Sequence, residues 1–173
     1  YVPFAFPSQP AAQFQPGVVR SWLVSGPFVA GDSAVLTAPA EVRSGPYRRV
    51  DALANGLVEL HRLIPLRPGT LDAGTVARLV VAADSAGTYR MDVGFSDAVT
   101  VLLDGRPLFH SSDAYDHANR RDGLIAFSQA ALFLPLRAGR NTLEFIVTDG
   151  FGGWGLMGRF PSMAGLRIIE PSQ

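Results

Sequence analysis

The sequence contains no cysteine and no lysine, and each absence excludes a class of chemistry. Without cysteine there is no disulfide framework, no thiolate metal site and no cysteine nucleophile. Without lysine all 15 basic side chains are arginines. We interpret this as a coding bias of the source, although arginine suits bidentate recognition of carboxylates. The 15 acidic residues bring the formal net charge to zero, and adjacent basic residues occur only at Arg48-Arg49 and Arg120-Arg121. A nucleic-acid partner is therefore not expected.

Long apolar runs are also missing, since none approaches the ~20 residues that would span a bilayer. Residues 1–17, YVPFAFPSQPAAQFQPG, lack both a basic n-region and an apolar h-region. They do not predict a signal peptide, and we expect an extended lead-in or linker. Residues 18–173 have the length of one ordinary domain and show no internal repeat, which predicts a single domain.

The clearest structural pattern is a two-residue alternation within residues 88–109, TYRMDVGFSDAVTVLLDGRPLF. Apolar side chains occupy every second position from Tyr89 to Phe95 and again from Val99 to Leu103. That period is typical of half-buried β-strands. A polar break at Ser96-Asp97 separates the two runs, and Asp104-Gly105 predicts a tight turn.

Other short apolar segments, separated by Gly/Pro-rich turns, predict further strands, and no segment predicts a helix longer than about two turns. Residues 29–50 are expected to be irregular, and residues 111–123 to form a long polar loop. Eight or nine short strands with regular turns indicate an all-β, antiparallel sandwich or barrel. Besides the two runs above, the expected strands are 18–25, 57–64, 76–83, 132–136, 142–148, 156–160 and 166–169.

Four stretches carry a resemblance to a known family: 20–28 (RSWLVSGPF), 95–108 (FSDAVTVLLDGRPL), 136–147 (LRAGRNTLEFIV) and 152–160 (GGWGLMGRF). In this order and spacing the sequence resembles the galactose-binding-like jelly-roll domains, which occur as accessory modules of glycoside hydrolases and other secreted enzymes. It departs from the common pattern at Asp104, where Asn is usual, and at Ala98, where Gly is usual. The resemblance implies a jelly-roll β-sandwich in a secreted or periplasmic setting. The family includes carbohydrate binders and purely structural spacers.

The segment from Ser111 to Gly123 is the densest collection of hydrogen-bonding groups in the chain. Tyr115 could stack on the apolar face of a sugar. Three neighbours could bond the sugar hydroxyls: Asp116, His117 and Arg120. An ordinary solvated loop explains the same composition equally well.

Trp154 is the best aromatic candidate for sugar stacking, provided that it is exposed. Burial in the sandwich is the favoured interpretation, as it is for Trp22, because large aromatic side chains usually serve the core. Trp154 also lies in a formal G-x-G-x-x-G match at 150–155. No helix-forming sequence follows, so dinucleotide binding is not expected. We expect instead that these glycines begin a strand and adopt positive φ.

Three carboxylates in or beside the polar loop offer hard oxygen ligands for a structural calcium ion: Asp113, Asp116 and Asp122. Related jelly rolls often bind calcium, but this spacing is not that of an EF-hand. His110 and His117 lie seven residues apart, which is no recognised zinc spacing. We therefore expect no cofactor, with a structural calcium ion as the one alternative that stays open.

Catalysis has little support in the sequence. The nearest string to a G-x-S-x-G elbow, residues 94–98, lacks the second glycine and the helix that must follow. His61 is expected in an apolar strand. Three aspartates could supply a glycosidase pair, although turn and strand-surface roles suit their neighbours better: Asp92, Asp97 and Asp104.

These observations favour a non-catalytic carbohydrate-binding or accessory module that works with a partner domain or protein. Two alternatives stay open. A structural or protein-interaction domain predicts that Tyr115 and Trp154 are buried or isolated, and that the surface has an apolar patch or an open sheet edge. A small glycan hydrolase predicts two carboxylates about 5 to 10 Å apart across a cleft.

Overall fold

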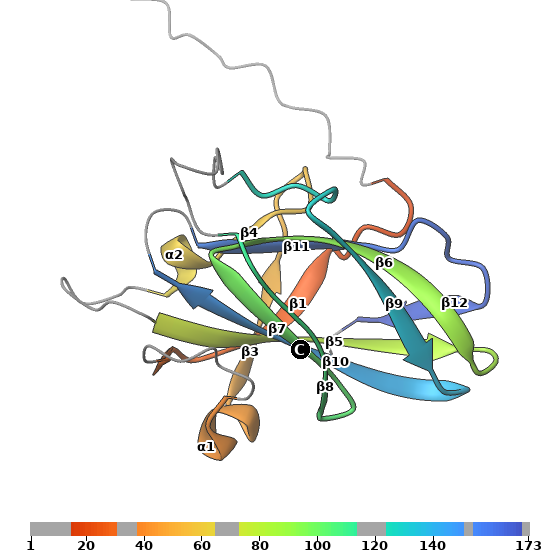
Figure 1. Cartoon of the computed structure of the whole chain (residues 1–173), viewed down its shortest axis with the longest axis horizontal. Coiled ribbons are helices and arrows are strands. Elements are labelled where there is room, and N and C mark those ends of the chain that lie inside the picture. The colour runs from red at the N-terminus through yellow and green to blue at the C-terminus, as the bar shows by residue number, and fades with distance from the viewer. Residues whose placement is uncertain (1–14, 31–37, 65–72, 114–123, 151–153, 171–173) are drawn as a thin grey trace, which may run out of the picture.

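The computed structural model describes residues 15–30, 38–64, 73–113, 124–150 and 154–170, which fold into two facing antiparallel sheets (Figure 1). The larger sheet has the order β3 (Tyr47–Asp51), β1 (Ser21–Ser25), β5 (Ala73–Ala83), β10 (Gly139–Asp149), β7 (Ala98–Leu103) and β8 (Arg106–Ser112), with β2 (Phe28–Val29) and β12 (Leu166–Ile169) also paired to β5. The smaller sheet has the order β4 (Val58–Glu59), β11 (Gly155–Arg159), β6 (Gly87–Ser96) and β9 (Ala130–Leu136). The predicted all-β antiparallel sandwich is confirmed.

The paired strands β5 and β10 form the centre of the larger sheet. They are in register over their whole length, from Ala73 opposite Asp149 to Ala83 opposite Gly139. The other edge of β5 is shared by β2, β1 and β12 in succession. The inward residues of β5 join the main core, while Val76 joins a second apolar cluster outside the sheet. Cover on both faces explains why the sequence of β5 is almost continuously apolar.

The main core lies between the two sheets and is built on large aromatic side chains. Trp22 meets Phe145 edge to face, with ring centroids 5.2 Å apart. Trp154 and Phe160 lie in the same core cluster and are almost fully buried. The tryptophans thus contribute apolar burial to the packing of one sheet on the other.

The polar break at Ser96-Asp97 marks a change of sheet. β6 ends at Ser96 in the smaller sheet, and β7 begins at Ala98 in the larger one. The turn after β7 is tight, as predicted, because Asp104 and Gly105 both have positive φ, 48° and 80°. Two successive positive values are typical of the hairpin turns that match the twist of the strands.

Three expectations about local structure were wrong. The polar loop does not begin at Ser111, because Ser111 and Ser112 are the last residues of β8 and pair with β7. Residues 57–64 do not form one strand: β4 ends at Glu59, and a helical turn, α2 (Leu60–Leu63), follows, so the exposed His61 lies on α2. Residues 29–50 are not wholly irregular, since they contain the helical turn α1 (Ala40–Arg43) and part of β3. β3 is an edge strand in which only Val50 is buried, so it has no apolar alternation to detect. No helix in the described ranges is long and apolar enough to cross a membrane.

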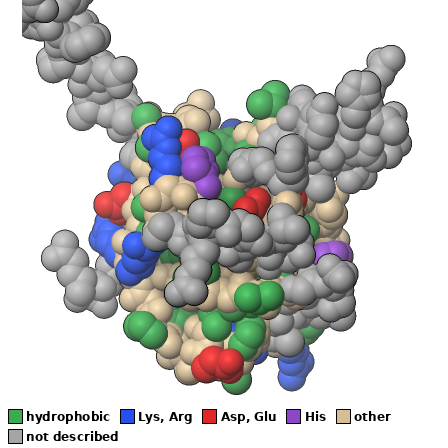
Figure 2. Space-filling view, turned by 90° about the vertical axis from the view of Figure 1, so that its left-hand side faces the viewer, with side chains coloured by type: hydrophobic (Ala, Val, Ile, Leu, Met, Phe, Trp, Pro, Cys, Tyr) green, Lys and Arg blue, Asp and Glu red, His purple; other side chains and the backbone are tan. Residues whose placement is uncertain are grey.

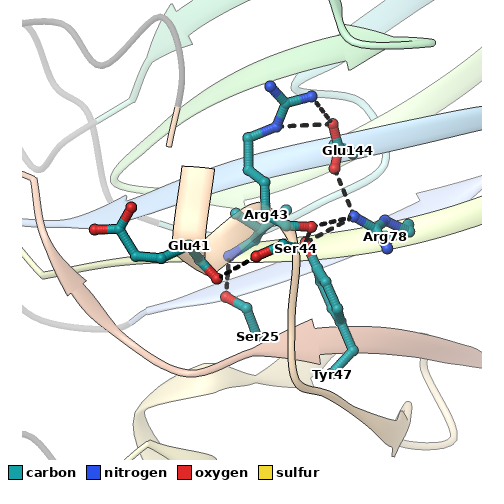
Figure 3. Close-up of polar contacts among 8 residues, drawn as sticks. Ser25, Glu41, Arg43, Ser44, Tyr47, Arg78 and Glu144 are labelled. Atoms are coloured by element: carbon teal, nitrogen blue, oxygen red, sulfur yellow. Dashed lines mark hydrogen bonds and ion pairs between the residues drawn. The ribbon is translucent and has the colours of Figure 1, made fainter. Parts of the chain in front are cut away.

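Charged side chains hold α1 against the outer face of the larger sheet (Figure 3). Glu144 of β10 is only 5% exposed and accepts bonds from Arg43 Nη2 at 2.6 Å and from Arg78 Nη2 at 2.9 Å. Arg78 also donates to the backbone carbonyl of Arg43 at 2.8 Å, and its guanidinium lies 4.0 Å from the centre of the Tyr47 ring. Burial raises the pKa of Tyr47 against the opposing charge of Arg78. We call Arg43, Tyr47, Arg78 and Glu144 the outer-face network.

Glycines let the residues after position 123 lie directly on the outer face of the smaller sheet. A Cβ atom on Gly94 would stand 2.5 Å from the carbonyl oxygen of Ala126. One on Gly155 would stand 2.7 Å from Ile125 Cδ1. Gly155 is not among the residues with positive φ, so close packing, not backbone conformation, is the reason for glycine there.

Candidate functional site at one end of the sandwich

The ends of five strands meet at one end of the sandwich. The register places Ala98 opposite both Ser112 and Thr148, and the neighbouring Asp149 opposite Ala73. β6 also ends there, at Ser96. We call Ser96, Asp97, Asp113, Gln129 and Gly150 the loop-end cluster, because Asp113 lies near the start of the polar segment, residues 111–123, that the sequence singled out. Figure 2 shows this end, with acidic, basic and histidine side chains on it.

Asp97 is the central residue of the cluster. It is only 4% exposed. Ser96 Oγ donates to its Oδ1 at 2.8 Å, and the backbone N–H of Gly150 donates to its Oδ2 at 2.8 Å. Its own backbone N–H bonds the carbonyl of Thr148 at 2.9 Å. The chain passes from the smaller sheet to the larger one at Asp97, and these bonds attach that point to the end of β10. Hydrogen bonds to both carboxylate oxygens compensate for the burial of Asp97.

Gln129 ties together the chain on both sides of residues 114–123. Its Nε2 donates to Asp113 Oδ2 and to the carbonyl of Phe95 at 3.0 Å. Its Oε1 accepts from the backbone N–H groups of Phe95 at 2.9 Å and Ala126 at 3.1 Å. Asp113 in turn donates its backbone N–H to the carbonyl of Asp97 at 2.7 Å. One amide side chain thus joins the start of the polar segment, the chain beyond it and strand β6.

Most of the predicted ligand-binding residues lie outside the described ranges: Tyr115, Asp116, His117, Arg120 and Asp122. Asp113 is described and belongs to the loop-end cluster. Trp154 is also described, but it is 1% exposed within the main core, and its ring cannot stack on a sugar there. The expectation of a stacking role for Trp154 is therefore corrected in favour of the core interpretation. Residue type alone could not decide this, because burial depends on which face of the chain meets the other sheet.

The calcium hypothesis has one described ligand, Asp113. Across the described ranges, no three His, Asp or Glu side chains come together as a metal site would require. The other two predicted ligands, Asp116 and Asp122, fall outside those ranges. His110 forms a hydrogen bond with Thr100 Oγ1 through Nδ1, at 2.9 Å.

The three aspartates considered for catalysis are spread over the fold. Asp97 lies at the loop end and Asp104 in the β7–β8 turn, with the whole length of β7 between them. Asp92 lies within β6, five residues before Asp97, which directly follows that strand. At ~3.3 Å per residue, the two aspartates are about 17 Å apart along the chain. None of these spacings suits a glycosidase pair.

Asp92 is held as a carboxylate on the outer face of the smaller sheet. Burial raises its pKa, but hydrogen bonds from Arg159 and Arg90 outweigh that effect, and the net shift of the pKa is downward. The bonds measure 2.9 Å from Arg159 Nη2 and 2.8 Å from Arg90 Nε. A general acid needs the opposite shift.

Sequence reasoning missed Ser96 and Gln129 as members of the cluster. Ser96 was visible only as part of a polar break between strands. Gln129 follows a stretch without periodicity, and its four hydrogen bonds go to three residues, Phe95, Asp113 and Ala126, in separate parts of the chain. No local pattern could have identified it.

No protein-family model matches the chain, and no curated protein matches its sequence. Solved structures do match. A β-glucosidase from Kluyveromyces marxianus, in complex with glucose, aligns with a TM-score of 0.50 and 12% identity over 86% of this chain and 17% of the enzyme. A family 35 carbohydrate-binding module from an environmental isolate aligns with a TM-score of 0.42 and 18% identity, over 57% of this chain and 73% of the module.

The PA14 domain of the MpAFP antifreeze protein aligns over 95% of this chain and 92% of that domain, with a TM-score of 0.43 and 14% identity. At such identities the likeness concerns the fold. The β-glucosidase match confirms that this chain has the fold of a β-sandwich domain found within a larger glycoside-active protein.

Proposed function

We propose that this chain is a non-catalytic carbohydrate-binding module of jelly-roll type that serves a secreted or periplasmic protein. The observation that carries the proposal is the loop-end cluster. Gln129 and Asp97 hold both approaches to the polar segment against the ends of the strands. A binding loop needs such a rigid base, because ordering a loose loop on a ligand costs conformational entropy.

The segment between these anchors has the side chains that sugar recognition requires. Tyr115 offers a flat ring for the C–H face of a pyranose, and three polar neighbours offer hydrogen bonds to its hydroxyls: Asp116, His117 and Arg120. The β-glucosidase match supports an accessory role, since the part that shares the fold of this chain covers 17% of that enzyme. Calcium, if bound, would be held by Asp113, Asp116 and Asp122 and would supply a cation that orders the segment.

The test is a glycan array followed by affinity gel electrophoresis, with and without EGTA. We expect saturable binding by the wild type and its loss in Tyr115→Ala. Asp113→Asn should weaken binding about tenfold, because it alters the contact with Gln129 at the base. Asp84→Asn, a change at an exposed aspartate at the start of the β5–β6 turn, is the matched control and should bind like the wild type.

Each outcome of this test distinguishes between the candidate functions. Loss of binding in EGTA would add calcium to the proposal, and unchanged binding would remove it. If no neutral or charged glycan binds at the loop end, the proposal is wrong, and a structural or protein-interaction domain takes its place. One observation favours the structural or protein-interaction domain: Trp154 is buried, which removes one of the two aromatic candidates for sugar stacking.

A further inference from the structure

A second candidate site lies at the opposite end of the strands. A cavity of about 610 Å³ opens between the β7–β8 turn and the end of β9. Leu103 opposes Leu143 on β10, five residues from the Thr148 that opposes Ala98, so the cavity lies roughly 17 Å from the loop end along the strand. That separation makes it independent of the loop-end cluster.

The walls of the cavity combine apolar surface with two arginines. Leu108, Pro107 and Pro135 provide the apolar part, and Arg106 and Arg137 the charge. Cavities of several hundred Å³ with an apolar lining and a few placed polar groups are typical of small-ligand sites. The volume lies within the range of about 300 to 1,000 Å³ that such sites have.

The two arginines are in different electrostatic states. Arg137 is paired with Asp104, whose Oδ2 accepts from Nε at 3.2 Å and from Nη2 at 2.9 Å. Asp104 is itself fixed, because its Oδ1 accepts the backbone N–H of Thr142 at 2.9 Å. Arg106 is exposed and has no acidic partner among the described residues. The cavity therefore has one surplus positive charge, on Arg106, beside an arginine whose orientation is held by Asp104.

We propose that this cavity binds a carboxylate-bearing saccharide, that is, a short uronic-acid glycan. Arg106 receives the carboxylate, since a guanidinium fork matches the planar geometry of that group. The prolines and Leu108 receive the C–H faces of the sugar rings. The proposal goes beyond the loop-end function, because it concerns a different site and is tested independently of that function.

Strand β9 extends the apolar surface beyond the cavity. Phe133 lies two residues before Pro135, so both side chains point to the same side of the strand, and Phe133 is 64% exposed. An exposed phenylalanine ring next to the cavity suits stacking on a further sugar unit. A trisaccharide should thus bind more tightly than a disaccharide, and the gain should depend on Phe133.

The experiment is a titration of the whole chain with digalacturonate, read by calorimetry and by backbone amide shifts. The methyl ester of digalacturonate is the matched probe, because esterification removes the charge of the carboxyl groups and adds only a methyl group to each. We expect saturable binding of the acid, shifts at residues 103–108 and 135–137, and no measurable binding of the ester. Arg106→Gln should weaken binding at least tenfold, as a charge-assisted hydrogen bond requires.

The controls separate this site from the other one and from general charge effects. Arg167→Gln removes an exposed arginine on β12 and should bind like the wild type. Asp113→Asn should leave the digalacturonate-induced shifts at residues 103–108 and 135–137 unchanged, whatever becomes of the loop-end proposal. Phe133→Ala should abolish the advantage of trigalacturonate over digalacturonate and keep the fold intact.

Three results would overturn the inference: equal binding of acid and ester, equal weakening by Arg106→Gln and Arg167→Gln, or no saturable binding of either uronate oligomer. Acetate is the further probe. If acetate shifts the same amides with the same affinity as digalacturonate, the cavity recognises an anion only, and the saccharide part is wrong.

Discussion

The outer faces of the two sheets are covered in contrasting ways. On the larger sheet, α1 is held down by the outer-face network, in which Arg43 and Arg78 bind a nearly buried Glu144 (Figure 3). On the smaller sheet, the residues leading to Gln129 lie on Gly94 and Gly155, with no room for a side chain below. One cover depends on charge pairing and the other on the absence of side chains.

Because of this difference, disrupting the two covers should have different consequences for stability and for the candidate binding segment. Removing a partner from a buried charge network leaves the remaining charges poorly compensated. Adding a side chain under a backbone segment forces that segment to move. Only the second cover leads to the loop-end cluster, so disruption there should reach the candidate binding segment, whereas disruption of the first should reach stability alone.

The largest effect is expected for Glu144→Gln. The substitution leaves Arg43 and Arg78 without their shared carboxylate, and we expect the free energy of unfolding to fall by about 3 kcal/mol. Urea denaturation followed by tryptophan fluorescence measures this. Glu41→Gln, at an exposed glutamate of α1, is the control and should change stability by less than about 0.5 kcal/mol. Equal effects of the two substitutions would contradict a special role for the network.

A smaller effect is expected for Gly94→Ala. The new Cβ would stand 2.5 Å from the backbone of Ala126, and overpacking of this kind costs roughly 1 to 3 kcal/mol. Backbone amide shifts should change around residues 126–129 and at Asp113. Gly87→Ala in the same strand is the matched control, since its Cβ would meet only the ring of Tyr89 at 3.6 Å. Amide shifts confined to β6 would show that Gly94 does not determine how residues 126–129 pack on the sheet.

The smallest effect is expected for Asp92→Asn, and it depends on pH. Because folding lowers the pKa of Asp92 below 3.8, its ionised form stabilises the fold above that pH. The stabilisation is lost as the pH falls through the lower pKa of the folded state. At pH 7 the variant should be less stable by about 1 to 2 kcal/mol, given that Arg90 and Arg159 are partly exposed. Urea denaturation at pH 7 and pH 3 should show the difference shrinking in acid, and a constant difference would exclude ionisation as its cause.

The sequence predicted those parts of the fold in which local pattern and tertiary role agree. β5, β6, β7, β9, β10 and β12 each carry their own apolar periodicity or an apolar run, and the Asp104-Gly105 turn has residues that accept positive φ. β3 and α2 were missed because edge strands and short helical turns bury too few side chains to leave a pattern.

By itself, the sequence determined that this chain forms short antiparallel strands and has one unusually polar segment, because both properties follow from the order of apolar and polar residues along a few positions. Only the tertiary structure decided that Trp154 is core, that Gln129 joins Asp113 to β6, and that Arg106 shares a cavity with Arg137. These contacts join residues far apart in the chain, and it is the packing of one sheet on the other that sets which side chains meet.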